Sequence, residues 1–256
     1  MNDAVNDAMN DAMNDAMNDT MNDAMNDTMN DAMNDGPLVE QIAERVAVVR
    51  QRIAAAGGAS AVQILGVTKT QPIEVVRAAV AAGVASVGES YVQEMTAKFA
   101  GGPVPGMDLH VIGHLQSNKV RQLLPFVAVV SSVDRMGLVR ELAARRPGQR
   151  VLVQVNTTGE ASKSGCEPGE TEAMVDAAAA AGLRVEGLMT IGPTAGAVPA
   201  TRAAFAALRR MVDALGLTVC SMGMTDDFEI AVGEGSTQVR LGTALFGVRP
   251  RKPPVG

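Results

Sequence analysis

A lysine at the end of an apolar segment is the first residue of this sequence that could do chemistry. Lys69 follows the apolar run 62–67 in the segment Gly-Val-Thr-Lys-Thr, residues 66–70. A lysine at the end of a buried strand is partly desolvated, which lowers the pKa of its amine and favours imine formation with a carbonyl. The alternative is a rim lysine in a salt bridge, and position alone favours that alternative.

Two short turns near the end of the chain could hold a phosphate group. The segment 221–224, Ser-Met-Gly-Met, precedes a predicted helix start at Asp226, and Gly242 and Thr243 follow the last apolar run. Backbone N–H groups at a helix start and at a glycine turn suit a phosphate, although ordinary turn and cap chemistry explains either segment alone. Arg240 lies beside the second turn, where it could donate to a ligand's ring nitrogen or form an ion pair inside the fold.

The two histidines do not indicate a metal site. His110 and His114 have no cysteine or carboxylate partner at metal-ligand spacing, so we expect them to form structural hydrogen bonds and expect no metal. The sequence contains no Walker motif, no Gly-x-Ser-x-Gly elbow and no His-Glu-x-x-His motif.

The elements that must position these residues alternate between short β-rich runs and helical patterns. We predict strands at residues 62–67, 84–88, 108–112, 126–131, 150–155, 184–187, 218–220 and 237–240. Helices are predicted at residues 37–56, 72–82, 90–100, 116–124, 135–145, 168–181, 199–215 and 226–232. Eight alternating strands indicate a parallel sheet, either open or closed into a barrel.

The strand count favours a single (β/α)8 TIM-type barrel. An open dinucleotide-binding sheet would also need a glycine-rich turn after its first strand, and this sequence has none there. In a barrel, chemistry gathers at the carboxyl ends of the strands. Lys69, Ser90, Ser221 and Arg240 all lie at or just after such ends, so we expect them to meet on one face.

Residues 1–35 differ from the rest of the chain. They repeat Met-Asn-Asp-Ala with occasional substitutions and hold nine aspartates and no Lys or Arg, so the formal net charge of −6 becomes +3 without them. A four-residue period builds no constant apolar stripe, so we predict a disordered tail at 1–35 and one barrel domain at 36–256. A partner-binding or methionine-based metal-binding arm is the alternative. The mild remaining charge does not favour nucleic acid.

The cysteine content indicates the cellular compartment. Two cysteines, Cys166 and Cys220, are too few for a disulfide framework and favour a reduced cytoplasmic setting. We find no signal peptide and no apolar stretch long enough for a membrane span.

Several segments together resemble the pyridoxal phosphate homeostasis proteins, which are related to the N-terminal barrel of alanine racemase. The matching segments are residues 66–70, 87–94, 110–119, 163–165, 187–191, 221–227 and 239–247, in family order. The resemblance implies a barrel of the type III fold of pyridoxal 5′-phosphate (PLP) proteins, with PLP held as a Schiff base on Lys69. The repeat lies outside the family pattern.

The resemblance also implies roles for the other site residues. It places the phosphate at Ser221, Gly242 and Thr243, with Arg240 facing the ring nitrogen, and it counts Met222 among the cofactor-binding residues. Lys163 resembles the family's second lysine, in a flexible Lys-Ser-Gly loop that contacts or receives the cofactor. The family usually has Asn where this chain has Ser90, so a hydrogen bond beside the ring is expected to change.

The resemblance is compatible with two functions, a PLP carrier and a PLP-dependent enzyme. The first is a monomeric protein of intracellular PLP homeostasis, without catalytic residues, that buffers or delivers PLP, with apo forms of PLP-dependent enzymes as candidate recipients. The second is a PLP-dependent amino-acid racemase. An arginine at the ring nitrogen makes the ring a weaker electron sink. A two-base racemase also needs an acid–base group on the opposite face of the substrate. The related racemase takes that group from a second domain, whereas only nine residues follow Gly247 in this sequence. A phosphosugar-binding barrel is a third alternative that leaves Lys69 unexplained.

Overall fold

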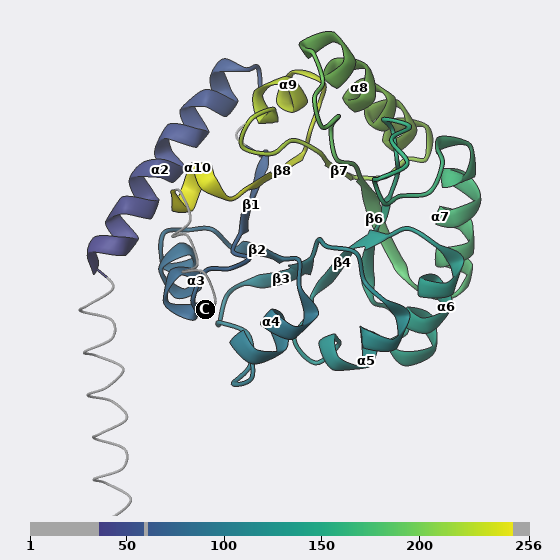
Figure 1. The fold of residues 1–256 in the computed structure, drawn as a ribbon, viewed down its shortest axis with the longest axis horizontal. Helices are drawn as coiled ribbons and strands as arrows, with labels where there is room; N and C mark the ends of the chain where they lie inside the picture. Colours follow the sequence, from purple (N-terminus) through teal and green to yellow (C-terminus); the bar gives the residue numbers. More distant parts are fainter. Residues whose placement is uncertain (1–35, 59–60, 248–256) are drawn as a thin grey trace, which may run out of the picture.

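Eight parallel strands close into one barrel in the computed structural model, which describes residues 36–58 and 61–247 (Figure 1). The strands are β1 (Gln63–Val67), β2 (Ser86–Glu89), β3 (Asp108–Val111), β4 (Val129–Val133), β5 (Arg150–Gln154), β6 (Arg184–Met189), β7 (Val219–Ser221) and β8 (Gln238–Leu241). Each strand pairs with the next in the sequence, and β8 pairs with β1. The predicted (β/α)8 barrel is confirmed.

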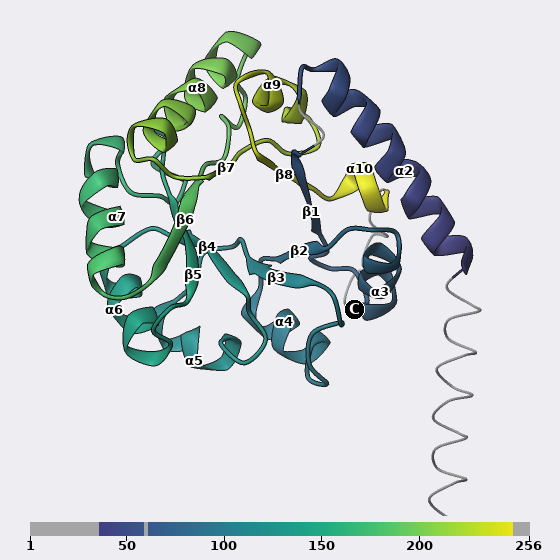
Figure 2. The same cartoon turned by 180° about the vertical axis from the view of Figure 1, so that it is seen from behind.

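Helices form the outer ring of the barrel, as both views show (Figures 1 and 2). They are α2 (Gly36–Ala55), α3 (Ile73–Ala81), α4 (Val92–Lys98), α5 (Val120–Leu123), α6 (Met136–Arg145), α7 (Thr171–Ala180), α8 (Val198–Ala214), α9 (Phe228–Gly233) and α10 (Thr243–Phe246). Short 3-10 turns, Ser117–Lys119 and Pro168–Glu170, precede α5 and α7. Gly83 and Gly182 follow α3 and α7 with φ of 88° and 86°, a backbone conformation that favours glycine.

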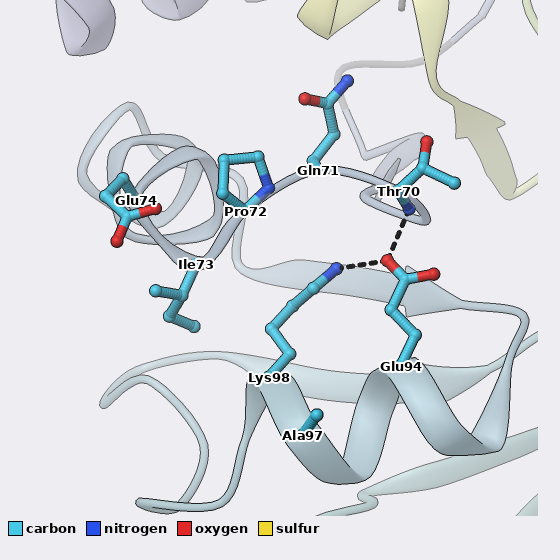
Figure 3. Close-up of a pocket in the computed structure, with 8 residues that line it drawn as sticks. All are labelled: Thr70, Gln71, Pro72, Ile73, Glu74, Glu94, Ala97 and Lys98. Carbon is cyan, nitrogen blue, oxygen red and sulfur yellow. Dashed lines mark hydrogen bonds and ion pairs between the residues drawn. The ribbon is translucent and has the colours of Figure 1, made fainter. Parts of the chain in front are cut away.

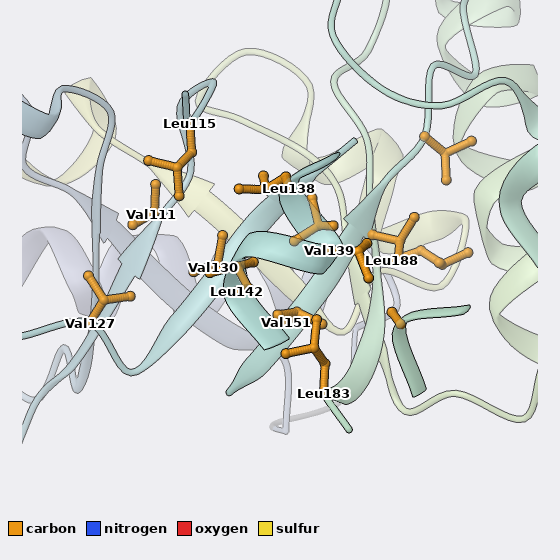
Figure 4. Packing of buried hydrophobic residues seen from close by; sticks show 14 of the residues in the cluster. Val111, Leu115, Val127, Val130, Leu138, Val139, Leu142, Val151, Leu183 and Leu188 are labelled. Carbon is orange, nitrogen blue, oxygen red and sulfur yellow. The ribbon is translucent and has the colours of Figure 1, made fainter. Parts of the chain in front are cut away.

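The main core lies between the sheet and the helices. Successive side chains of a strand point to opposite faces, so the valines and leucines of one face meet the helix layer. Val111, Val130 and Val151 of the sheet belong to one buried cluster with Leu138 and Leu142 of α6 (Figure 4). Because parallel strands are covered on the outside by helices and filled on the inside by side chains, their sequences are nearly continuous in apolar residues.

The barrel interior carries polar side chains near the amino ends of the strands. Arg150 of β5 bonds to Asp108 of β3 at 2.6 Å and to Glu186 of β6 at 2.8 Å. These ion pairs join three strands at the end of the barrel opposite Lys69. The carboxyl ends of the strands do not take part in these ion pairs.

Some element boundaries differ from the prediction. Strand β4 begins at Val129 rather than at residue 126, because residues 126 and 127 still bond back to Leu123 at the end of α5. Helix α10 was not predicted, since four residues are too few for a periodic pattern. The prediction of a disordered tail at 1–35 lies outside the described residues. In the part of the chain that the structure describes, no helix has the length and apolar character needed to cross a membrane.

Candidate cofactor site

Four of the predicted site residues line one cavity of about 310 Å³ at the carboxyl ends of the strands. Lys69 follows β1, Ser90 follows β2, Lys163 lies in the loop after β5, and Arg240 is in β8. The remaining lining residues are Val67, Ile112, Gly113, His114, Gln154, Ser162, Ser164, Met189, Ile191 and Met224. The barrel therefore brings two lysines and an arginine to one place, as the strand-end argument predicts.

The lysine that follows β1 sits in a tight turn. The Gln71 N–H donates to the carbonyl oxygen of Thr68 at 2.9 Å, which closes the turn around Lys69 and Thr70. Thr70 has φ of 65° and is the one non-glycine residue with positive φ in the described ranges 36–58 and 61–247. A β-branched residue rarely adopts this conformation, so the turn beside Lys69 is strained and needs support from its surroundings.

A buried charged cluster lies behind this turn. Glu89, at the end of β2, is fully buried and accepts hydrogen bonds from Lys98 at 2.6 Å and from the Thr68 hydroxyl at 2.7 Å. Burial raises the pKa of Glu89, while the bonds from Lys98 and Thr68 oppose that shift. Sequence reasoning missed this cluster, since Thr68, Glu89 and Lys98 come from three elements whose contact depends on the closed barrel.

Arg240 is buried inside the barrel and binds two neighbouring strands. Its guanidinium donates to the Ser221 carbonyl oxygen at 2.8 Å, to Ser221 Oγ at 3.0 Å and to the Thr190 carbonyl oxygen at 2.6 Å. Burial lowers the pKa of Arg240 to about 10, and the nearby carboxylate of Asp227 only partly offsets the cost. The site therefore holds a poorly solvated positive charge, which an anionic ligand would stabilise.

A chain of amides and hydroxyls fixes Arg240 from below. Ser221 Oγ donates to Gln238 Oε1 at 2.8 Å, Gln238 Nε2 donates to Gln63 Oε1 at 2.7 Å, and Gln63 Nε2 donates to Ser86 Oγ at 2.8 Å. This chain crosses β7, β8, β1 and β2 in turn. The Ser221 hydroxyl is thus a member of the barrel interior and is not among the residues that line the cavity.

The other predicted cofactor-binding residues also lie beside the cavity rather than in its lining. The Met222 side chain is buried in the main core, with its sulfur 3.7 Å from Cys220 Sγ, so only its backbone could meet a ligand. Gly242 and Thr243 form the turn into α10. The Ala244 N–H donates to Thr225 Oγ1 at 3.3 Å, which brings this turn next to the turn that follows β7.

Backbone donors are available where these two turns meet. No acceptor among the described residues pairs with the N–H groups of Gly223, Gly242 and Thr243. Gly223 has φ of 95°, and a Cβ there would lie 2.6 Å from the Ala231 Cβ, so only glycine fits. Such clustered N–H groups form the kind of concave site that binds a phosphate.

The loop that carries Lys163 is held against the barrel by its glycine. Gly165 has φ of 132°, and a Cβ there would lie 2.5 Å from the backbone nitrogen of Asn156. That close approach lets the Asn156 N–H donate to the Cys166 carbonyl oxygen at 2.9 Å. Gln154 Nε2 also donates to the Ser164 carbonyl oxygen at 2.8 Å, so the end of β5 fixes both sides of the loop.

The second lysine already has partners. Lys163 Nζ donates to Glu160 at 2.9 Å and also to the Gly192 carbonyl oxygen. Bonds from Thr194, together with Lys163, lower the pKa of Glu160 to about 2. Lys163 therefore reaches the cavity as one member of an ion pair, and sequence reasoning did not identify Glu160 as its partner.

Ser90 and the histidines differ in burial. A Cβ on Gly113 would lie 2.3 Å from the Ser90 carbonyl oxygen, so this glycine allows the loops after β2 and β3 to touch. His110 faces Ser131 at 3.1 Å, and burial lowers its pKa to about 4. His114 is half-exposed, lines the cavity, and lies 3.1 Å from Asp134. Both histidines thus make side-chain hydrogen bonds, as expected.

Comparisons with known proteins identify the family of this chain. The family model of the alanine racemase N-terminal domain matches residues 39–250. A pyridoxal phosphate homeostasis protein of Pseudomonas aeruginosa is 44% identical over 220 residues, which cover 83% of this chain and 96% of that protein. The chain belongs to the pyridoxal phosphate homeostasis protein family.

The fold is also similar to those of solved structures. PipY of Synechococcus elongatus, a structure with PLP bound, is similar with a TM-score of 0.68 and 31% identity, over 80% of this chain and 100% of that one. Alanine racemase of Corynebacterium glutamicum is similar with a TM-score of 0.63 at 19% identity, over 85% of this chain and 63% of the racemase chain. The racemase likeness concerns the fold, whereas the PipY likeness lies within this family.

Proposed function

We propose that this chain binds pyridoxal 5′-phosphate through a Schiff base to Lys69 and acts in PLP homeostasis as a buffer or delivery protein. The observation that carries the proposal is the meeting of Lys69 and buried Arg240 in one cavity at the carboxyl ends of the strands. Family membership and the PLP-bound PipY support it. Bound PLP supplies an aldehyde that an amine can capture and a dianionic phosphate.

The chain's own residues fit each part of this cofactor. The Lys69 amine would hold the aldehyde carbon, and the strained turn at Thr70 fixes the direction of the lysine. Arg240 would face the ring nitrogen, since its guanidinium borders the cavity while Ser221 and Thr190 hold it in place. Ser90 lines the cavity and would lie beside the ring, with a shorter side chain than the family's usual Asn.

The phosphate is proposed to lie where the two turns meet. The N–H groups of Gly242 and Thr243, with that of Gly223, would donate to it, while Ser221 and Met222 contribute by shaping the turn. Ser221 Oγ already donates to Gln238, so we assign its hydroxyl to positioning Arg240 more than to the phosphate. Lys163 would contact or receive the cofactor by exchanging its bond to Glu160.

We infer a carrier rather than a racemase. Racemisation by two bases needs an acid–base group on each face of the substrate. Tyr91, the sole tyrosine of the sequence, is 56% exposed and is not among the lining residues. We also propose that the protein acts as a monomer and that apo forms of PLP-dependent enzymes are the recipients. The buried free thiols of Cys166 and Cys220 fit the cytoplasmic setting that we propose.

Borohydride trapping tests the proposal. Incubation of the purified chain with PLP should produce an absorbance band near roughly 420 nm, a property of the cofactor's imine. Reduction with borohydride followed by peptide mapping should place the label on Lys69. Lys69→Ala should abolish the band, whereas Lys119→Ala, which alters a lysine outside the cavity lining, should keep it. A label found only on other lysines would contradict the assignment, and rapid racemisation of alanine would contradict the carrier role.

A further inference from the structure

We propose that Glu94 and Lys98 of α4 are positioning residues that hold the Lys69 turn in the geometry that its Schiff base requires. The proposal rests on the proposed function, since it concerns the same lysine. Neither residue lines the cavity of about 310 Å³ that contains Lys69. Both line a second, open hollow on the outer side of the turn, with Thr70 and Gln71 (Figure 3).

Both peptide groups that flank Lys69 bond to this helix. The Thr70 N–H donates to Glu94 Oε1, and Lys98 Nζ donates to the Thr68 carbonyl oxygen at 2.9 Å. Glu94 and Lys98 also bond to each other at 2.9 Å, as Figure 3 shows, so the two contacts act as one unit. The backbone on each side of Lys69 is therefore fixed by a charged side chain from α4.

The turn needs such support because its conformation is unfavourable for its sequence. Thr70 is β-branched and has φ of 65°, which costs free energy unless surrounding contacts impose it. Without the acceptor on Glu94, the Thr70 N–H would lose its charge-assisted bond and the turn could relax towards negative φ. Such a relaxation would redirect the Lys69 side chain.

The cluster is also anchored more firmly than a surface ion pair. Lys98 is 6% exposed and bonds at 2.6 Å to Glu89, whose side chain is fully buried. Glu89 in turn accepts from the Thr68 hydroxyl at 2.7 Å. Burying these charges costs desolvation free energy, but their hydrogen bonds then hold the side chains in fixed positions. Such a network suits a turn whose geometry must be fixed.

A second acid–base pair with the same i,i+4 spacing lies on a helix away from the cavity. Glu141 and Arg145 of α6 form an i,i+4 pair, and Glu141 is 28% exposed, close to the 25% of Glu94. Glu141 bonds only to Arg145 among the described residues. Glu141→Ala is therefore a matched control for Glu94→Ala, because both remove one carboxylate from a helix pair.

A double-mutant cycle with Lys69 tests the proposal. PLP dissociation constants are measured by equilibrium dialysis for the unaltered chain, Glu94→Ala, Lys69→Ala and the double variant. Glu94→Ala should weaken PLP binding by about tenfold or more, the fold-change expected from loss of a charge-assisted bond. In the Lys69→Ala background, the same change should have less than about a twofold effect, because the contact acts through Lys69. Glu141→Ala should change binding in neither background.

The outcomes separate this inference from the proposed function. If the unaltered chain forms no borohydride-trapped adduct on Lys69, the proposed function fails. If the adduct forms but Glu94→Ala weakens binding equally with and without Lys69, or not at all, only the positioning role is overturned. If Glu94→Ala does not fold, the double change Lys98→Met, Glu89→Gln takes its place in the cycle. This double change removes both charges of the buried Lys98–Glu89 ion pair, so neither charge is left unpaired.

Discussion

At the scale of single residues, the barrel interior holds several polar groups whose ionisation is set by burial. His110 is 3% exposed, and its Nε2 has no hydrogen-bond partner among the described residues. Its pKa falls to about 4 because a charged imidazole would be poorly solvated there, with Asp108 only partly compensating. Burial lowers the pKa of Arg240 in the same direction, but only to about 10, so Arg240 keeps its charge at neutral pH at an energetic cost.

The His110 shift predicts how stability depends on pH. The unfolded imidazole takes up a proton near pH 6.5, while the folded one stays neutral until about pH 4. The unfolded state therefore binds more protons in this window, and folding stability falls as pH drops from 6.5 to 4. A shift of this size corresponds to about 3 kcal/mol at most.

His110→Gln should remove this contribution, since glutamine keeps polar atoms but does not titrate. Urea unfolding at pH 7 and at pH 4 gives the free energy of unfolding for each protein. The loss of stability between the two pH values should be smaller in the variant by about 1–3 kcal/mol. An identical loss in both proteins would show that His110 does not carry the effect. Glu89, whose raised pKa acts in the opposite direction, is common to both.

At the scale of elements, glycines decide how closely the loops approach the site. Gly165 allows the Lys163 loop to lie against the backbone of β5, and Gly113 allows the loop after β3 to touch Ser90. The Gly113 contact joins the loops of two neighbouring strands, whereas the Gly165 contact holds the loop after β5 against the end of its own strand. The cavity is therefore shaped by backbone approach as well as by its functional side chains.

Gly165→Ala should move the Lys163 loop away from the barrel. An added Cβ meets the Asn156 backbone, and φ of 132° is strained for alanine, so the cost is about 1–3 kcal/mol. We expect a lower thermal midpoint and weaker PLP binding in titrations. Gly169→Ala is the control, because a Cβ there has no atom within 4 Å and the residue has no positive φ. Equal behaviour of the two variants would refute this account of the loop.

The sequence predicted the elements better than the contacts between them. All eight strands were expected, because apolar runs and glycine turns are local signals. The meeting of Lys69 with Arg240 also followed from the strand-end rule. The orientation of Ser221 towards Gln238 did not, since it depends on which face of β7 is interior. The contact of Lys98 with Glu89 arises only once α4 packs on the closed barrel.

At the scale of the whole molecule, the two ends of the barrel have different tasks. The carboxyl ends of the strands carry the cavity, whereas the amino ends carry ion pairs that contain no cavity-lining residue. Arg150 bridges Asp108 and Glu186 there, across β3, β5 and β6. The exception is the hydrogen-bonded chain of amide and hydroxyl groups from Ser86 to Arg240, which runs through the barrel interior up to the cavity.

Arg150→Leu should therefore lower stability without altering the site. The two ion pairs are partly exposed, with Arg150 at 36%, so their loss should cost about 1–2 kcal/mol. In a chain of this size that cost corresponds to a fall in thermal midpoint of roughly 2–8 °C. At a temperature where both proteins are folded, PLP affinity and the absorbance band should be unchanged.

The matched comparison is Gln238→Leu, which breaks the polar chain that supports Arg240. It should lower stability and also weaken PLP binding, because the Ser221 O–H then loses the acceptor that leaves its oxygen free to accept from Arg240. Calorimetry gives the thermal midpoints, and equilibrium dialysis gives the affinities. If Arg150→Leu changes PLP affinity as much as Gln238→Leu does, the two ends of the barrel are coupled, and the division between a stabilising end and a binding end is wrong.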